Sequence, residues 1–134
     1  DRRKVFFSGD TGLTPAFEEI GRVHGPFDLV MLEVGAFHPS WGGIHLGPEN
    51  ALKAFTMLGG GTLLPVHWGT FNLALHAWHE PAETLVTLAG SQGLRVVTPR
   101  LGVAAEVSRL AGPQPWWRDT LAAAPSPCPV LGGT

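Results

Sequence analysis

Apolar runs alternate along this chain with segments in which apolar residues recur at helical spacing. The runs are short, rich in Val, Leu and Phe, and bounded by glycine, proline or polar residues, which predicts strands at 4–8, 28–34, 62–66 and, more briefly, 94–98. The helical segments each open at a proline, which favours the first turn, and are expected at 15–24, 48–58 and 81–92. Strands and helices that alternate through short connections predict a mainly parallel sheet flanked by helices, an α/β fold.

The last part of the chain has a different character. We expect residues 1–110 to form one lobe and residues 111–134 to form a Pro-rich tail, extended or disordered, that contains Trp116, Trp117 and Cys128. The two tryptophans are interpreted as a packing or interface contact rather than as a platform for nucleic-acid bases, because the net charge is acidic.

The amino-acid composition excludes several classes of function but does not identify one. The 134 residues, 44% of them hydrophobic and 15% charged, suit one globular domain, and the net charge of -2 argues against a nucleic-acid or membrane partner held by charge. No apolar run is long enough to span a bilayer, and the single cysteine provides neither an internal disulfide nor a cysteine-built metal site. We expect a cytoplasmic location, at a membrane surface only if the substrate is a lipid.

Two metal-competent side chains directly follow predicted strands. Asp10 lies in the turn Ser8–Gly12, and His67 follows the strand at 62–66. Ligands of open α/β sheets bind at this edge, and a carboxylate with an imidazole there indicates a divalent metal. The alternative for each is structural, since Asp often accepts backbone hydrogen bonds in turns and a strand-end His is often only hydrogen-bonded.

Two further residues carry candidate chemistry. His45 directly precedes a predicted helix, where an anionic group is favoured, so it suits contact with a substrate phosphate or proton donation to a leaving group. It could equally be a plain loop histidine. Glu33 falls inside a buried strand, which leaves two interpretations: a hydrogen-bonding partner of a metal ligand, or a solvated acid at the strand end.

Four strings occur in order over about residues 4–81: Phe7–Gly12, Gly35–Phe37 with Pro39 and Trp41, His45–Ala51, and Val66–Phe71. Together they resemble the C-terminal half of the metallo-β-lactamase-fold hydrolases. The branch they resemble most includes N-acyl-phosphatidylethanolamine-hydrolysing phospholipase D and the ascorbate-6-phosphate lactonase-like proteins. The fold implied is one half of an αββα sandwich.

The resemblance also implies roles. Asp10 would bridge two zinc ions, or manganese or iron in their place, and His67 would ligate one of them. His45 would act on the substrate's phosphate or leaving group, and Trp41 and Phe71 would contact the substrate. A phosphodiester or related ester, lipid or small molecule, would be cleaved by metal-bound hydroxide without a covalent enzyme intermediate.

One departure from the family pattern changes the expectation for this chain. The family's H-x-H-x-D-H string, and a further histidine before the G-D-T-G turn, do not occur in it. Since a zinc site needs three or four ligands, we expect a lobe that is inactive until completed by the missing N-terminal half or by a second copy. The alternatives are a non-catalytic α/β domain that binds a partner through its apolar face and, less favoured, a phosphate-binding loop at Ser8–Gly12.

Overall fold

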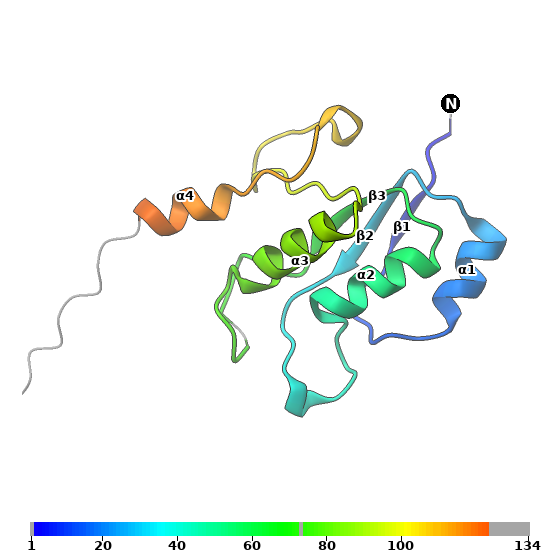
Figure 1. The fold of residues 1–134 in the computed structure, drawn as a ribbon, viewed down its shortest axis with the longest axis horizontal. Coiled ribbons are helices and arrows are strands. Elements are labelled where there is room, and N and C mark those ends of the chain that lie inside the picture. Colours follow the sequence, from blue (N-terminus) through cyan, green and yellow to red (C-terminus); the bar gives the residue numbers. More distant parts are fainter. Residues whose placement is uncertain (1, 73, 124–134) are drawn as a thin grey trace, which may run out of the picture.

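A three-stranded parallel sheet forms the centre of the molecule. The computed structural model describes residues 2–72 and 74–123 (Figure 1). Its strands are β1 (Val5–Phe7), β2 (Leu29–Glu33) and β3 (Thr62–Val66), hydrogen-bonded in the order β1-β2-β3. Chain order and spatial order therefore coincide, as the alternation of strand and helix predicts.

Helices fill the connections between the strands. They are α1 (Ala16–His24), α2 (Gly47–Met57), α3 (Glu80–Ser91) and α4 (Trp116–Ala123), with short 3-10 turns η1 (Pro39–Trp41) and η2 (Val107–Arg109). The first three begin within one residue of the proline that predicts their start. Within the described residues, no helix has the length and apolar character needed to cross a membrane.

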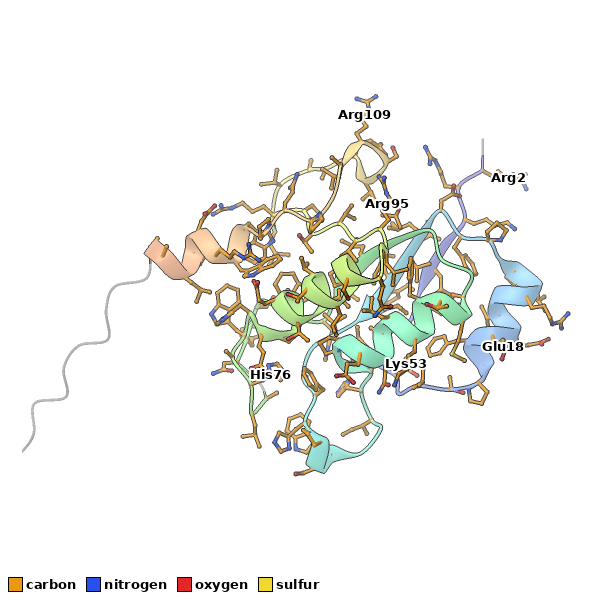
Figure 2. All side chains as sticks on the ribbon, viewed as in Figure 1. Arg2, Glu18, Lys53, His76, Arg95 and Arg109 are labelled. Atoms are coloured by element: carbon orange, nitrogen blue, oxygen red, sulfur yellow. The ribbon has the colours of Figure 1, made fainter. Side chains whose placement is uncertain are left out.

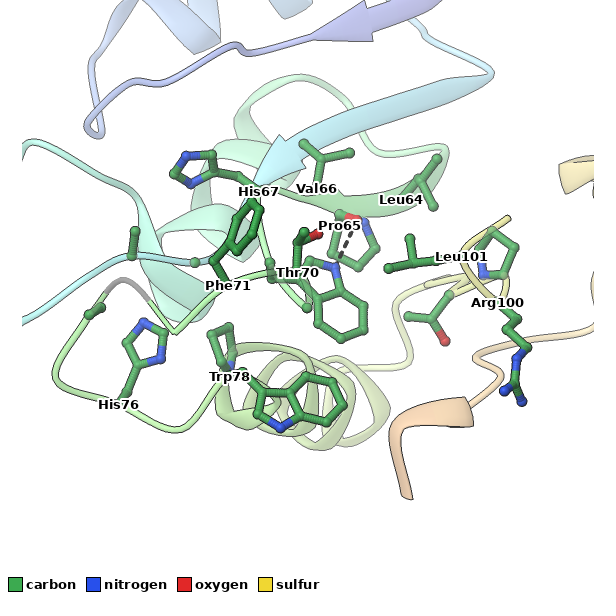
Figure 3. A pocket seen from close by; sticks show the side chains of 18 of the residues that line it. Leu64, Pro65, Val66, His67, Thr70, Phe71, His76, Trp78, Arg100 and Leu101 are labelled. Atoms are coloured by element: carbon green, nitrogen blue, oxygen red, sulfur yellow. Dashed lines mark hydrogen bonds between the residues drawn. The ribbon is translucent and has the colours of Figure 1, made fainter. Parts of the chain in front are cut away.

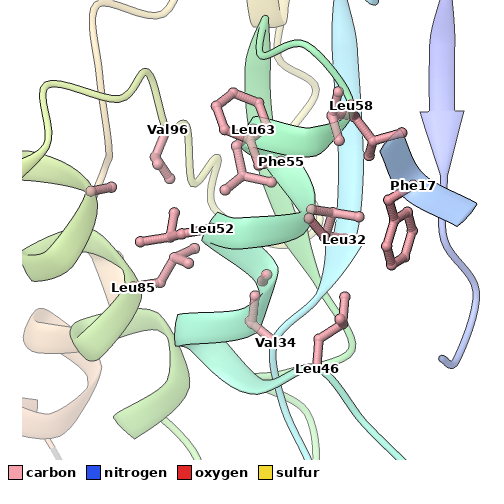
Figure 4. Close-up of a cluster of buried hydrophobic side chains, with 14 of the residues drawn as sticks. Phe17, Leu32, Val34, Leu46, Leu52, Phe55, Leu58, Leu63, Leu85 and Val96 are labelled. Carbon is pink, nitrogen blue, oxygen red and sulfur yellow. The ribbon is translucent and has the colours of Figure 1, made fainter. Parts of the chain in front are cut away.

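The core lies between one face of the sheet and the helices. Leu32 and Leu63 point from the strands toward α2, whose Leu52 and Phe55 are also buried (Figure 4), and Val30 belongs to the same buried cluster. Side chains alternate across a strand, so the intervening residues face the opposite side of the sheet. On that side Val5 is 51% and Phe7 62% exposed, which leaves an apolar sheet face partly uncovered.

Charged side chains lie on the outside of this arrangement. Arg2, Glu18, Lys53 and Arg109 project away from the ribbon in Figure 2, and all four are exposed. Glu18 and Lys53 thus place charge on the outer sides of α1 and α2, whereas the uncovered sheet face carries Val5 and Phe7.

The predicted fourth strand is reduced to one bridge. Val96 pairs with Leu63 in parallel, and the ladder extends no further among the described residues. Pro99 cannot donate a backbone hydrogen bond, and Thr98 instead exchanges hydrogen bonds with Gln114 through its hydroxyl. The chain therefore leaves the sheet after Val96.

The prediction of an extended tail is wrong for residues 116–123, which form α4. Trp117 is completely buried, and its indole Nε1 donates to the carboxylate of Glu83 on α3 at 2.7 Å. Arg118 binds the same carboxylate at 2.6 Å. These tertiary contacts stabilise a helix of eight residues that local sequence does not indicate. Cys128 and the rest of 124–134 lie outside the described residues, and the division at residue 110 stays a prediction.

Candidate metal centre

Four polar side chains gather at the carboxyl edge of the sheet. Asp10 follows β1, Glu33 ends β2 and His67 follows β3, while His45 comes from the segment before α2. Parallel strands end at the same edge, so residues distant in sequence meet there. The structure thus brings the two predicted ligands and the predicted catalytic histidine together, with Glu33 between them.

His67 is held in an unusual backbone conformation. Its φ is 62°, in the left-handed region that few non-glycine residues adopt. Its carbonyl oxygen lies so close to Gly35 that a Cβ on that glycine would come within 2.1 Å of it. Sparsely populated conformations persist where surrounding contacts enforce them, often at functional sites. Here the turn directs the imidazole back toward the strand ends.

His67 and Asp10 are placed as two ligands of one metal would be. The Nε2 atom of His67 lies 3.6 Å from Oδ1 of Asp10. Two atoms each about 2.1 Å from a tetrahedral metal are about 3.4 Å apart, so a zinc-sized ion fits between them with little movement. The Asp10 side chain is 67% exposed and that of His67 33%, which leaves the pair open to solvent on one side.

Glu33 is completely buried, so its interpretation as a solvated strand-end acid is wrong. Its Oε1 accepts the backbone N–H of Thr11 at 2.9 Å and that of Leu46 at 3.2 Å. Its Oε2 lies 2.5 Å from Nδ1 of His45 and 3.5 Å from Nδ1 of His67. The carboxylate therefore faces both imidazoles at their Nδ1 atoms.

A second ligand set is geometrically available. Ligand atoms of Glu33, His45 and His67 all lie within 4.8 Å of one another, and such a group can hold a metal ion. The 2.5 Å between Glu33 and His45, however, is well short of the roughly 3.4 Å that separates two ligands of one tetrahedral ion. This pair has the geometry of a hydrogen bond, whereas Asp10 and His67 have that of co-ligands.

An apolar cavity of about 610 Å³ adjoins His67. Figure 3 shows Pro65, Phe71 and Trp78 around it, with Leu101 on the far side. Phe71 lines this cavity and is 72% exposed, consistent with access for a ligand.

Trp41, the other predicted substrate contact, is not one of the described residues that line the cavity. It lies in η1, with its ring centroid 6.1 Å from that of His38. Its role in substrate binding stays a prediction.

A tryptophan cluster supports the segment that carries His67. Trp68 donates its indole N–H to the carbonyl of Pro65 at 3.0 Å, stacks on Trp116 at 5.5 Å and meets Trp117 edge-on at 5.3 Å. The packing role expected of the Trp116–Trp117 pair is confirmed, and the structure adds that the pair packs on Trp68, the residue after His67. Sequence patterns could not reveal it, because the contact joins α4 to a distant loop.

His76, in the loop before α3, contacts Phe37 in the loop that follows β2. Its Nε2 accepts the backbone N–H of Phe37 at 3.4 Å, and the two rings stack at 4.9 Å between centroids. Figure 2 labels it in the loop before α3. This contact joins the loop after β2 to the loop after β3, both of which border the site.

The chain is similar to known proteins in sequence and in fold. A family model described as the beta-lactamase superfamily domain matches residues 1–68. An uncharacterised protein of Mycobacterium tuberculosis is 44% identical over 118 residues, which cover 86% of this chain and 32% of the relative. The N-acyl-phosphatidylethanolamine-hydrolyzing phospholipase D 1 of Caenorhabditis elegans is 32% identical over 92 residues, covering 66% of this chain and 26% of that protein.

A solved structure is similar as well. Igni18, described as a novel metallo hydrolase from the archaeon Ignicoccus hospitalis, matches with a TM-score of 0.60 and 25% identity, over 76% of this chain and 40% of that one. The chain spans about a third of the length of the mycobacterial relative and about a quarter of that of the nematode relative.

Proposed function

Because this chain belongs to the beta-lactamase superfamily domain family, we propose that it forms part of the active site of a metal-dependent hydrolase acting on a phosphodiester or related ester. The observation that carries the proposal is the placement of His67 Nε2 3.6 Å from Asp10 Oδ1 at the carboxyl edge of the sheet. The name of the nematode relative as a phospholipase D, and that of the archaeal neighbour as a metallo hydrolase, support the reaction class.

Asp10 and His67 are the proposed metal ligands in this chain. Zinc is the proposed ion, since imidazole and carboxylate both suit it, and manganese or iron would accept the same donors. When bound, such ions lower the pKa of water and neutralise charge that develops on the substrate. Asp10 has two carboxylate oxygens and an exposed side chain, so it can bridge two ions.

His45 is the proposed catalytic residue. Its Nδ1 is occupied by Glu33, which leaves Nε2 to face a substrate. In the imidazolium form, with a proton on each nitrogen, the Nε2 proton could pass to the leaving oxygen or bind the phosphate. The half-buried side chain, 19% exposed, is reachable from the solvent side of the site.

The apolar cavity is the proposed place for the apolar part of the substrate. Phe71 lines it directly beside His67, whereas Trp41 would have to approach from η1. A lipid or a small aromatic or alkyl phosphoester fits this combination of an apolar wall and a polar strand edge. A lipid substrate would place an otherwise cytoplasmic enzyme at a membrane surface.

The rest of the site is proposed to come from another lobe. Asp10 and His67 are two ligands, and closed zinc sites have three or four. The apolar sheet face that exposes Val5 and Phe7 supports burial against the N-terminal half of the same fold or a second copy. We propose that the isolated chain is inactive. A non-catalytic domain that binds a partner through this same face is the second candidate, favoured by the same two exposed residues.

Metal content and hydrolysis test the proposal together. Zinc, manganese and iron per mole of desalted chain would be measured by mass spectrometry, for wild type and Asp10→Asn. Hydrolysis of bis(4-nitrophenyl) phosphate would be followed with and without added zinc. Metal lost in Asp10→Asn supports the ligand assignment, and metal without hydrolysis supports an incomplete lobe. Metal bound equally and above background in both proteins would overturn the ligand assignment, whereas metal at background in both would support the incomplete lobe.

A further inference from the structure

Glu33 connects every segment that carries a residue of the candidate site. It ends β2 and is completely buried, yet none of its contacts lies within its own strand. Through Thr11 it binds the turn that carries Asp10, through Leu46 and His45 it binds the segment before α2, and its Oε2 faces His67. A charged group is rarely buried unless such partners satisfy it.

The two oxygens of the Glu33 carboxylate face different donors, backbone N–H groups on one and an imidazole on the other. Oε1 is occupied by two backbone N–H groups, those of Thr11 and Leu46. Oε2 is left for Nδ1 of His45, at 2.5 Å. An ionised carboxylate can only accept hydrogen bonds, so the neutral imidazole must carry its proton on Nδ1. The opposite tautomer would place two acceptors against each other.

We propose that Glu33 is a positioning residue that fixes the tautomer and the orientation of His45. The proposal rests on the proposed function, in which His45 acts through Nε2, but it concerns hydrogen bonding that exists without metal or substrate. Glu33 directs Nδ1 inward with its proton and leaves Nε2 facing outward. It is not itself a metal ligand, because its oxygens are already used by three donors.

The same carboxylate faces the second imidazole. The Nδ1 of His67 lies 3.5 Å from Oε2, and its Nε2 faces Asp10. A histidine ligand commonly has its second nitrogen beside a carboxylate, which orients the ring. Glu33 is thus hydrogen-bonded to His45 and faces His67 from one buried position, and the turn with Asp10 is tied to it through Thr11.

Glu33→Gln gives a sharp test, because glutamine cannot satisfy all three donors. Its amide oxygen can accept from the two backbone N–H groups, and its NH₂ group then points at Nδ1 of His45. An NH₂ group donates, so Nδ1 must become the acceptor and the proton must move to Nε2. The substitution changes charge and donor pattern but almost no volume.

The experiment is a long-range ¹H–¹⁵N correlation spectrum of the ¹⁵N-histidine-labelled chain. It is recorded without metal, in chelator, over a series of alkaline pH values, and the tautomer is assigned where the ring ¹⁵N shifts no longer change with pH. His45→Gln assigns the signals. Glu49→Gln serves as the matched control, since Glu49 is an exposed carboxylate on α2 close to His45 in sequence.

We expect His45 to be the Nδ1–H tautomer in wild type and in Glu49→Gln, and the Nε2–H tautomer in Glu33→Gln. A purely structural role for Glu33 would alter stability but leave the tautomer unchanged, and that result would overturn the proposal. Should Glu33→Gln fail to fold, the wild-type spectrum decides: Nδ1–H supports the proposal and Nε2–H overturns it.

The tautomer experiment can fail or succeed independently of the metal-content experiment that tests the proposed function. An Nδ1–H tautomer in a chain that still binds metal above background without the Asp10 carboxylate would overturn the metal assignment and leave the role of Glu33 standing. Loss of metal in Asp10→Asn together with an Nε2–H tautomer in wild type would support the metal assignment and overturn the role of Glu33.

Discussion

The Nε2 atom of His67 lies 3.6 Å from Oδ1 of Asp10, across the edge where β1 and β3 end. β2 lies between these two strands, so the pair is brought together by the loops that follow them and not by neighbouring strands. The left-handed turn at His67 and the turn that begins at Gly9, also with positive φ, aim the two side chains at one point.

Loss of either member of this pair should abolish metal binding. In the complete enzyme we expect His67→Asn and Asp10→Asn each to lower bound zinc to background, measured by mass spectrometry after dialysis. Asparagine is chosen at 67 because it tolerates a left-handed backbone, as His67 requires. Because Asp10 is exposed, its variant should unfold within about 0.5 kcal/mol of wild type without metal. Full occupancy in both variants would contradict the site assignment.

His45→Gln should separate turnover from metal binding. In the complete enzyme we expect phosphodiester turnover to fall by about 10²–10⁴, the range for loss of a general acid or base, while zinc content stays unchanged. The two readouts are kcat from a chromogenic substrate and metal per chain. A parallel loss of zinc would place His45 among the ligands, in the set with Glu33 and His67.

Gly35→Ala should disturb the site through its backbone. The added Cβ would meet the carbonyl oxygen of His67 at 2.1 Å, and backbone atoms cannot move aside as a side chain does. We expect a loss of about 1–3 kcal/mol in the free energy of unfolding, the usual cost of overpacking, measured by urea denaturation. Gly43→Ala is the matched control, since nothing lies within 4 Å of its Cβ position. Similar losses in both variants would contradict the close-approach explanation.

The attachment of α4 should depend on pH. Hydrogen bonds from Arg118 and Trp117 lower the pKa of Glu83 from its ordinary value near 4.5. A carboxyl whose pKa is lowered by folding stabilises the native state above the unfolded pKa, and this stabilisation is lost as pH falls through the folded value.

The test compares wild type with Glu83→Gln by thermal unfolding between about pH 3 and 7. Glutamine can still accept from Trp117 but removes the charge that binds Arg118. At neutral pH wild type should be more stable by less than about 1 kcal/mol, because the pair is partly exposed, and the difference should shrink as pH falls below the ordinary value of 4.5. A constant difference across this range would show that the charge of Glu83 is not responsible.

Much of the fold follows from local sequence. The apolar runs at 28–34 and 62–66 and the prolines at helix starts place β2, β3 and the first three helices within a residue or two. The predicted fold, one half of a metallo-β-lactamase sandwich, is confirmed by the parallel sheet and by the similarity to a solved metallo hydrolase. These features depend on periodicity and on turn residues, which a single segment carries by itself.

The candidate site was only partly predictable. Asp10, His45 and His67 stand out because each is a polar group next to a strand end or a helix start. Whether Glu33 was solvated or bonded to a histidine could not be decided, since the answer depends on the backbone N–H groups of Thr11 and Leu46, which approach it from other segments.

The sequence by itself determined the order of strands and helices and which chemistry-bearing residues follow the strands. Only the tertiary structure decided that Glu33 is buried between two imidazoles, that 94–98 forms a single bridge, and that Trp116–Ala123 is a helix. The physical reason is the same in each case. Local propensity is a weak preference, and hydrogen bonds and burial supplied by distant segments, such as Glu83 for α4, override it.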